Sequence, residues 1–301
     1  MSQKQIDPGI SVVLPAHGAL EYLFQTLDSI YFSTVIPNEV LLVDDGINPD
    51  IVKEVVLRYP RIRLLPNEGS GLVDALNTGI KNSRFDLVAR IDADDLMEPE
   101  RLESQLAAFR SNPSLVVLGS QVTYIDELGI SNGQSDYLTG DITVVTRKGE
   151  SCLLAHPSVM YRLESVILVG GYRKTFRVNQ VDLAEDYDLW VRLSRLGQVV
   201  NSQQLLTRYR QHSLQLSNMH RIPQEMSSIY ISAVSKYEDN GLQIAPSLSI
   251  QQAEPIRWTS IKFVASQLGL REGSRYFIEY LACKKIIGFS TRRLLSRLLR
   301  L

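Results

Sequence analysis

Short apolar runs alternate with segments of helical periodicity over the first 118 residues. The apolar runs lie at 11–15, 40–43, 61–65, 86–91 and 115–118. The segments between them, at 20–31, 51–59, 71–82 and 100–110, carry apolar residues at the spacing of one helical face. Strands separated by helices predict a mostly parallel sheet, flanked by helices and joined by right-handed crossovers. The pattern therefore indicates an α/β fold.

The alternation becomes less regular between residues 120 and 212. This stretch contains a glycine pair, Gly170-Gly171, an acidic segment that opens a helix at 184–196, and a further segment at 205–217. Beyond residue 217 the spacing of apolar residues is helical. We therefore expect one folded unit over 1–217, divided into halves at 1–118 and 119–217, and then a helical extension over 218–301.

Composition and charge narrow the class of protein. The 301 residues are 44% hydrophobic and 22% charged, which is ordinary for a globular protein. Lys and Arg number 32 against 33 for Asp and Glu, so we expect no nucleic-acid partner. The two cysteines, Cys152 and Cys283, are far apart, which argues against a cysteine metal site and favours a reducing compartment. With neither a secretory signal nor a bilayer-length apolar run in the sequence, we expect a cytoplasmic protein.

Two acidic clusters follow apolar runs of the predicted sheet. Asp44-Asp45-Gly46 follows the second run, and Asp92-Ala93-Asp94-Asp95 follows the fourth. In parallel sheets, ligands bind beyond the carboxyl ends of the strands. Three carboxylates within four residues repel one another, and oxygen ligands suit Mg²⁺ or Mn²⁺. A metal site is therefore one interpretation of the second cluster, and a solvated turn that caps a helix is the other.

A third acidic segment, Glu185-Asp186, opens the helix at 184–196. In the structural interpretation, these two residues are acidic because the helix dipole stabilises negative charge at the start of a helix. In the functional interpretation Asp186 is a general base. Neither a G-x-G-x-x-G nor a P-loop pattern occurs, so dinucleotide-binding and P-loop NTPase folds of those types are not supported.

Eight segments occur in an order that is far more specific than any one of them. They are SVVLP at 11–15, VDDG at 43–46, N-x-G-I at 77–80, ARIDADD at 89–95, HPSVM at 156–160, GGY at 170–172, EDYDLW at 185–190 and Y-R-x-H at 209–212. Together they resemble the family 2 glycosyltransferases of the GT-A fold, over roughly residues 9–217. The family usually follows the first strand with Pro-x-Tyr-Asn, whereas this chain has Pro15-Ala16-His17-Gly18.

The resemblance implies a role for each matching residue. In the nucleotide-binding half, 1–118, the expected nucleotide-sugar contacts are Pro15, Ala16, Asp44, Asp45, Arg90, Asp92, Ala93 and Asp94. The expected ligands of a Mn²⁺ or Mg²⁺ cofactor are Asp92, Asp94 and His212, and Asp95 could share that work. In the acceptor-binding half, 119–217, the expected catalytic residues are Asp186 as base and its neighbour Glu185. The glycine pair resembles the flexible loop near the acceptor, and Arg210 could pair with phosphate.

The activity implied by the resemblance is an inverting transfer of sugar from a nucleotide-diphosphate donor. The expected nucleotide is UDP, and the acceptor is a hydroxyl on a glycan or a lipid-linked glycan in cell-surface polysaccharide synthesis. A nucleotidyltransferase and a non-catalytic nucleotide-sugar-binding protein are the alternatives. A nucleotidyltransferase would be expected to carry a basic loop after the first strand, and residues 15–21 contain none.

The end of the chain is basic and amphipathic. Residues 271–301 contain eight basic and two acidic residues, and leucines alternate with arginines at helical spacing over 291–301. Such a helix suits the surface of an anionic membrane, and it equally suits packing on the catalytic domain. Peripheral membrane contact at the inner face through 291–301 therefore stays open. A homodimer is a separate possibility.

Overall fold

The structure is a computed structural model that describes residues 8–18, 21–148, 152–174, 176–178, 181–212, 228 and 231. The expected helical extension, 218–301, with its amphipathic end at 291–301, lies outside the described residues apart from Ser228 and Ile231. In chain order the elements are β1 (Ile10–Gly18), α1 (Leu23–Tyr31), β2 (Glu39–Ile47), α2 (Pro49–Arg58), β3 (Ile62–Pro66), α3 (Leu72–Asn82), β4 (Leu87–Arg90), β5 (Leu96–Met97), α4 (Arg101–Ser111), β6 (Leu115–Ile125), β7 (Ser131–Gln134), β8 (Gly140–Asp141), α5 (Thr143–Lys148), a 3-10 turn (His156–Ser158), β9 (Met160–Arg162), α6 (Leu163–Leu168), β10 (Phe176–Val178), β11 (Val181–Leu183), α7 (Glu185–Leu193) and β12 (Gln198–Arg210).

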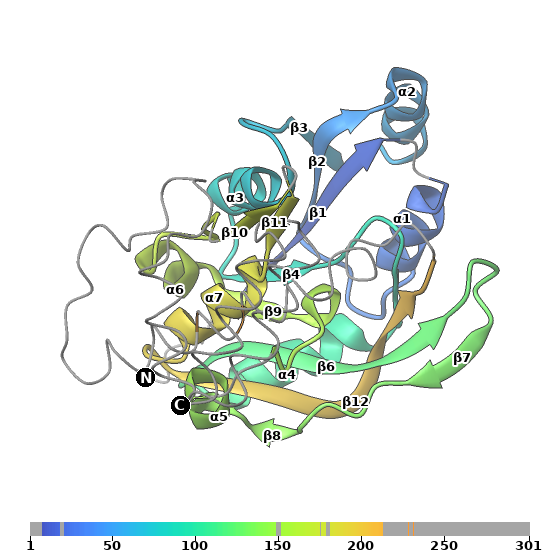
Figure 1. Ribbon diagram of the computed structural model, residues 1–301. Helices are drawn as coiled ribbons and strands as arrows, with labels where there is room; N and C mark the ends of the chain where they lie inside the picture. Colours follow the sequence, from blue (N-terminus) through green and yellow to red (C-terminus); the bar gives the residue numbers. More distant parts are fainter. Residues whose placement is uncertain are drawn as a thin grey trace, which may run out of the picture.

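A ten-stranded mixed sheet forms the centre of the molecule (Figure 1). Its main path runs β3-β2-β1-β4-β9-β6-β12-β5, with β7 paired to β6 and β8 paired to β12. The first four strands of this path are parallel, as predicted, and β12 is parallel to β6. Strand β9 is antiparallel to both β4 and β6, between which it lies. Because β6 runs through residue 118, the two expected halves share one sheet.

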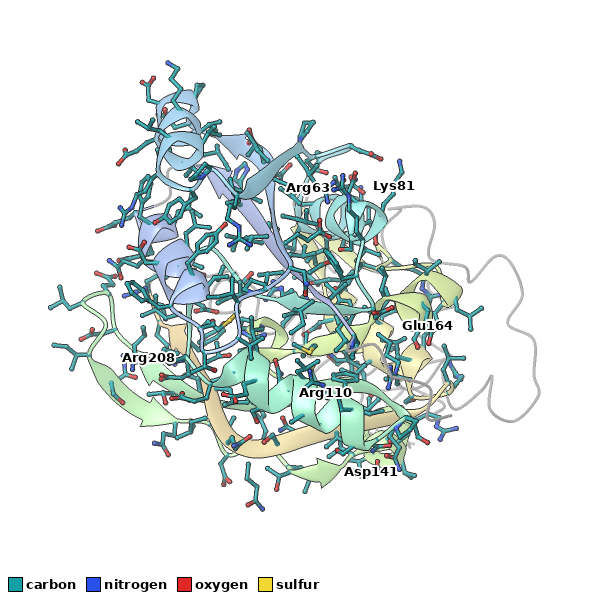
Figure 2. All side chains as sticks on the ribbon, turned by 180° about the vertical axis from the view of Figure 1, so that it is seen from behind. Arg63, Lys81, Arg110, Asp141, Glu164 and Arg208 are labelled. Carbon is teal, nitrogen blue, oxygen red and sulfur yellow. The ribbon has the colours of Figure 1, made fainter. Side chains whose placement is uncertain are left out.

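Apolar side chains on the two faces of the sheet form two cores. On one face, Val12 and Leu14 of β1 pack with the apolar sides of α1 and α4. On the other face, Val13 packs with α3, and the same core extends to Val166 of α6 and Trp190 of α7. Figure 2, seen from behind, brings α4 with its Arg110 to the front of the sheet. The result is three layers, helix, sheet and helix, as expected of an α/β fold.

A fully buried arginine fixes the centre of the sheet. The Arg101 guanidinium donates to the carbonyl oxygens of Arg90 at 2.8 Å, Val159 at 3.1 Å and Pro157 at 2.7 Å, and to Oγ1 of Thr207 at 3.2 Å. Burial, and to a lesser extent the nearby charge of Arg90, lowers the pKa of Arg101 to about 9. These bonds tie the end of β4 to the 3-10 turn and to β12, so Arg101 positions the loop that follows β4.

The ends of several elements differ from their predicted positions. Strand β6 continues from the predicted run at 115–118 as far as Ile125, and residues 205–210 belong to the long strand β12. Among the described residues, no helix combines the length and the apolar character needed to cross a bilayer.

Candidate functional site

The carboxyl ends of β1 and β2 bring the first group of predicted residues together. Pro15 pairs with Val43 and Ala16 with Asp44, and both Pro15 and Ala16 are buried. The Asp44 carboxylate accepts hydrogen bonds from the backbone N–H groups of Gly46 at 2.9 Å and Ile47 at 2.7 Å, which fixes the backbone at the carboxyl end of β2. The helix that follows, α2, is capped by the side chain of Asn48 and not by this acidic cluster.

Asp45 connects the carboxyl end of β2 to the start of α3. Its carboxylate accepts from the backbone N–H of Gly71 at 3.0 Å and from the side-chain amide of Asn67 at 2.7 Å. Nδ1 of His17 lies 2.5 Å from the Asp45 carbonyl oxygen, so the residue that departs from the family pattern contacts the predicted nucleotide pocket. Asp44 and Asp45 thus hold the backbone at the carboxyl end of β2 and at the start of α3.

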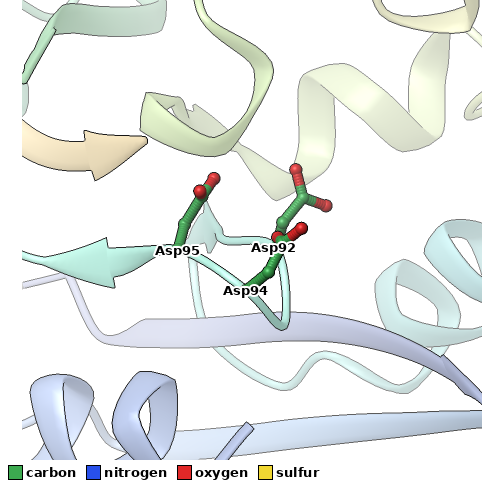
Figure 3. Close-up of side chains that lie close together, drawn as sticks. All are labelled: Asp92, Asp94 and Asp95. Atoms are coloured by element: carbon green, nitrogen blue, oxygen red, sulfur yellow. The ribbon is translucent and has the colours of Figure 1, made fainter. Parts of the chain in front are cut away.

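The loop after β4 gathers three carboxylates (Figure 3). Asp92, Asp94 and Asp95 each offer an oxygen, and these oxygens all lie within 4.8 Å of one another. Arg90 holds Asp92 in a two-pronged ion pair, with nitrogen–oxygen distances of 2.6 and 2.5 Å. Burial raises the pKa of Asp92 in spite of this ion pair, and the charges of Asp94 and Asp186 raise it further. The loop therefore holds more negative charge than its own arginine neutralises.

The other two carboxylates are tied to the end of β12. Nε2 of His212 lies 3.0 Å from Oδ2 of Asp94, so this predicted metal ligand does contact the acidic loop. Asp95 is 1% exposed, and one of its oxygens accepts the backbone N–H of Arg210 at 2.8 Å. Its other oxygen is buried and has no hydrogen-bond partner in the described part of the chain. Burial and the charges of Asp94 and Asp92 raise the pKa of Asp95 well above its usual value.

These residues fit a hard divalent cation. Closely spaced carboxylate oxygens are the ligands that Mg²⁺ and Mn²⁺ prefer, and a bound cation would relieve both the raised pKa values and the partnerless oxygen of Asp95. The alternative, a turn that caps α4, is not supported: the residue at the start of that helix is Glu100, and no side-chain hydrogen bond caps it. The backbone of the loop is itself held, since Oγ1 of Thr26 donates to the Ala93 carbonyl oxygen at 2.9 Å.

Arg210, which the resemblance pairs with phosphate, is held by oxygens of the protein itself. The buried Arg210 guanidinium donates to the carbonyl oxygens of Asp94 at 2.8 Å and of Asp126 and Glu127 at 3.0 Å each. It also lies over the Tyr22 ring, 4.1 Å from the ring centre. Arg210 therefore joins the acidic loop to the β6–β7 hairpin and to the start of α1, and it stabilises their backbone.

The third predicted cluster opens α7 after a strained residue. Ala184 has a φ of +56°, and it is the one non-glycine residue with positive φ in the described part of the chain. One oxygen of Asp186 accepts the backbone N–H of Tyr187 at 2.7 Å, and the other lies 3.4 Å from Sγ of Cys152. Burial raises the pKa of Asp186. Because the charge of Asp186 also acts on Asp92, the candidate base lies within electrostatic reach of the acidic loop.

Glu185 faces a buried aromatic cluster. It is 7% exposed, and its Oε1 lies 3.7 Å from Nδ1 of His156, whose Nε2 lies 2.9 Å from the Tyr172 hydroxyl. Burial and the charge of Arg90 lower the pKa of His156 well below its usual value, so this imidazole is neutral at pH 7. Trp190 packs edge-on against His156 at a ring distance of 5.9 Å. The HPSVM and GGY segments therefore meet beneath the start of α7.

Two contacts near the candidate site are not predicted by the sequence. Asn77 of α3 accepts the Tyr172 N–H and donates to the Tyr172 carbonyl oxygen, each at 2.9 Å, which pins the segment after the glycine pair. Gly171 in that pair has a φ of +72°. The second contact joins Cys152 to Asp186 and has no spacing signal, because 34 residues separate the two.

The sheet order and the loop-borne acidic site define a GT-A fold. Solved structures share it at low identity. A Staphylococcus aureus TarS structure in complex with UDP-GlcNAc has a TM-score of 0.59 at 16% identity, covering 86% of this chain and 71% of that chain. The mannosyltransferase PcManGT of Pyrobaculum calidifontis, in complex with GDP-Man and Mn²⁺, has a TM-score of 0.56 at 14% identity, covering 97% of this chain and 79% of that chain.

Sequence comparison defines the family within this fold. Residues 11–167 match glycosyl transferase family 2, and the chain belongs to this family. Among its relatives, the amylovoran biosynthesis glycosyltransferase AmsE of Erwinia amylovora is 33% identical over 60% of this chain and 66% of its own length. The Escherichia coli chondroitin synthase is 28% identical over 63% of this chain, but the match spans 27% of that protein. The O-antigen biosynthesis glycosyltransferase WbnJ of Escherichia coli is 27% identical over 61% of this chain and 71% of its own length.

Proposed function

We propose that this protein transfers a sugar, with inversion, from a nucleotide-diphosphate donor to a hydroxyl group of a glycan or lipid-linked acceptor. The observation that carries the proposal is the meeting of two acidic elements at one end of the sheet. The Asp92–Asp95 loop, joined by His212, lies within electrostatic reach of Asp186 on α7. A nucleotide-sugar transferase needs both, one for the diphosphate and one for the acceptor proton. Family membership favours this activity over nucleotidyl transfer.

The donor lies, in this proposal, across the carboxyl ends of β1, β2 and β4. Pro15, Ala16, Asp44 and Asp45 line the nucleoside end of the pocket in the half formed by residues 1–118. Asp92, fixed by Arg90, faces the ribose and the diphosphate, and Ala93 lets the loop approach closely because its side chain is small. We propose UDP as the nucleotide, which agrees with the UDP-GlcNAc complex of one structural relative.

Asp94, Asp92 and His212 would hold Mn²⁺ or Mg²⁺, with Asp95 behind them. When bound, the cation supplies Lewis-acid stabilisation of the negative charge that grows on the leaving diphosphate. The protein's own contribution is to hold these oxygens ready: Arg90, Thr26 and Arg210 fix the loop before any ligand arrives.

Asp186 is the proposed general base. Its burial raises its pKa, which makes the carboxylate a better proton acceptor for an acceptor hydroxyl that is a poor nucleophile at neutral pH. Its Oδ1 is occupied by the Tyr187 N–H, so Oδ2 is the oxygen that would take the proton. Attack on the face of the sugar opposite the diphosphate inverts the anomeric carbon. The acceptor then binds in the half formed by residues 119–217, with Glu185 beside the base.

The acceptor class comes from the relatives. Two of them are described as biosynthetic enzymes of amylovoran and of O-antigen, so we propose a role in cell-surface polysaccharide synthesis. An acceptor carried on a lipid would place the enzyme at the inner face of the membrane.

The test is the variant Asp186→Asn. We expect sugar transfer to fall at least about 100-fold, in line with the loss of a general base, while calorimetry shows unchanged UDP binding in the presence of Mn²⁺. Titration of UDP, GDP and dTDP, each with and without Mn²⁺, identifies the nucleotide. Asp136→Asn, at an exposed carboxylate on the β7–β8 connection, is the matched control. Full turnover by Asp186→Asn would exclude this residue as the base.

A further inference from the structure

We propose that Cys152 is a positioning residue for this activity: its thiol donates a hydrogen bond that holds one oxygen of the Asp186 carboxylate in place. The inference rests on the proposed function, in which Asp186 is the base. It concerns a residue outside the eight segments that carry the family resemblance.

The Asp186 carboxylate has two neighbours that limit its rotation. Oδ1 accepts the N–H of Tyr187, the next residue, at 2.7 Å. Oδ2 lies 3.4 Å from Sγ of Cys152, which comes from the segment leading into the 3-10 turn. The carboxylate torsion of aspartate is broad, so one contact from an adjacent backbone group fixes it poorly. The second contact, from a different part of the fold, defines the direction in which Oδ2 presents its remaining lone pair.

Cys152 is itself fixed by its surroundings. Its side chain is partly buried, and it packs against two apolar clusters. One is the core beneath the sheet, which includes Trp190, and the other includes Ala184 and Tyr187 at the start of α7. A side chain packed from two directions cannot follow a rotating carboxylate, so it constrains the carboxylate instead.

The thiol is a donor in this environment. Burial raises the pKa of Cys152 well above its usual value, and the neighbouring Asp186 charge raises it further, so the sulfur keeps its proton at neutral pH. Its single proton has two acceptors within reach, the Leu154 carbonyl oxygen at 3.3 Å and Asp186 Oδ2 at 3.4 Å. A charged acceptor forms the stronger bond, which favours the carboxylate whenever Asp186 is ionised.

The kinetic test compares two substitutions of similar size. Cys152→Ala removes the donor, and we expect kcat to fall about three- to tenfold, the range of a single hydrogen bond, with the KM for the nucleotide-sugar unchanged. Cys152→Ser keeps a donor at the same position and should recover a larger share of kcat. Equal losses in the two variants, or a kcat for Cys152→Ala equal to that of the unaltered protein, would overturn the inference. Thermal unfolding of both variants checks that they fold.

A second measurement needs no turnover. The S–H stretching band in the infrared shifts to lower frequency when the thiol donates a hydrogen bond, and a Cys283→Ser background leaves Cys152 as the sole thiol. We expect Asp186→Asn to move this band to higher frequency, because a neutral amide accepts less strongly than a carboxylate. An unchanged band refutes the Cys152 contact alone. Absence of sugar transfer by the unaltered protein refutes the proposed function, and with it the role of Cys152, even where the band shifts.

Discussion

The substitution Asp95→Asn should stabilise the protein in the absence of divalent cations. Asp95 is 1% exposed, one of its oxygens has no partner in the described part of the chain, and its pKa is raised well above the usual value. Asparagine has the same shape, and its carbonyl oxygen can still accept the Arg210 N–H. The exchange therefore removes a buried charge and keeps the described contact.

The size of the effect follows from the spacing of the carboxylates. At the 4.8 Å that bounds the oxygen separations, two unit charges repel by about 3.5 kcal/mol at an effective dielectric constant of about 20. Asp92 is already paired with Arg90, and the Asp94 side chain is 33% exposed, so water and the ion pair cancel much of this energy. We expect a net gain of about 1–2 kcal/mol, or roughly 2–8 °C in melting temperature for a domain of this size.

The pH dependence gives the prediction its sign. A carboxyl group whose pKa is raised by folding holds its proton more tightly in the folded state, so its contribution to stability is greatest below the unfolded pKa of about 3.8 and is lost as the pH rises through the folded value. The stability gain of Asp95→Asn should therefore vanish at pH values below 3.8 and grow as the pH rises above it.

The assay is thermal unfolding, monitored by circular dichroism, in EDTA and again with Mn²⁺. It is repeated at pH values from below 3.8 to 7. In EDTA at pH 7 the variant should melt higher than the unaltered protein. Mn²⁺ should raise the melting temperature of the unaltered protein more than that of the variant, since a bound cation offsets the same repulsion. Asp136→Asn, which removes an exposed charge, should change neither value. An equal or lower melting temperature for Asp95→Asn in EDTA would refute the argument.

Three further substitutions test how the backbone positions the site. Ala184→Gly should stabilise the fold by roughly 0.5–1 kcal/mol in denaturant unfolding, because glycine adopts the φ of +56° without strain. The strain that is relieved is larger than the extra conformational entropy that glycine loses on folding. Gly79→Ala should lower the free energy of unfolding by about 1–3 kcal/mol, since the added Cβ would lie 2.4 Å from Cγ1 of Val13. Calorimetry of the double variant with Val13→Ala should show a loss smaller than the sum of the two single losses. Asn77→Ala removes both hydrogen bonds to the Tyr172 backbone, and hydrogen exchange at the Tyr172 amide should accelerate at least about tenfold.

The parallel part of the sheet follows from local sequence. Runs such as 11–15 and 40–43 are too short and too continuously apolar for surface elements, so they predict buried strands, and the structure contains β1 and β2 there. The acidic clusters are then predictable in place, since parallel strands end at one edge of the sheet. This reasoning predicts the Asp92–Asp95 loop at that edge, whereas its contact with His212 was implied by the family resemblance alone.

The antiparallel part of the sheet and the burial of two arginines could not be predicted in the same way. Strand β9 is three residues long, and its position between β4 and β6 depends on pairing with strands more than 40 residues away in sequence. Nothing in the sequence marks the carbonyl oxygens that surround Arg101 and Arg210 in the fold. Their described partners lie as far as 106 residues away for Arg101 and 185 for Arg210, beyond any periodicity.

The three buried arginines near the acidic loop act on it in different ways, and the difference explains its chemistry. Arg90 pairs directly with the Asp92 carboxylate. Arg101 instead donates hydrogen bonds to carbonyl oxygens, to a hydroxyl and to a side-chain amide oxygen. The described guanidinium bonds of Arg210 also go to carbonyl oxygens, including that of Asp94 and the side-chain amide of Gln25. Arg101 and Arg210 thus hold the backbone of the site through oxygens other than the carboxylate oxygens of the acidic loop. The negative charge that they leave on the loop is the charge that a divalent cation needs, so the same interior that positions the loop keeps it ready to bind metal.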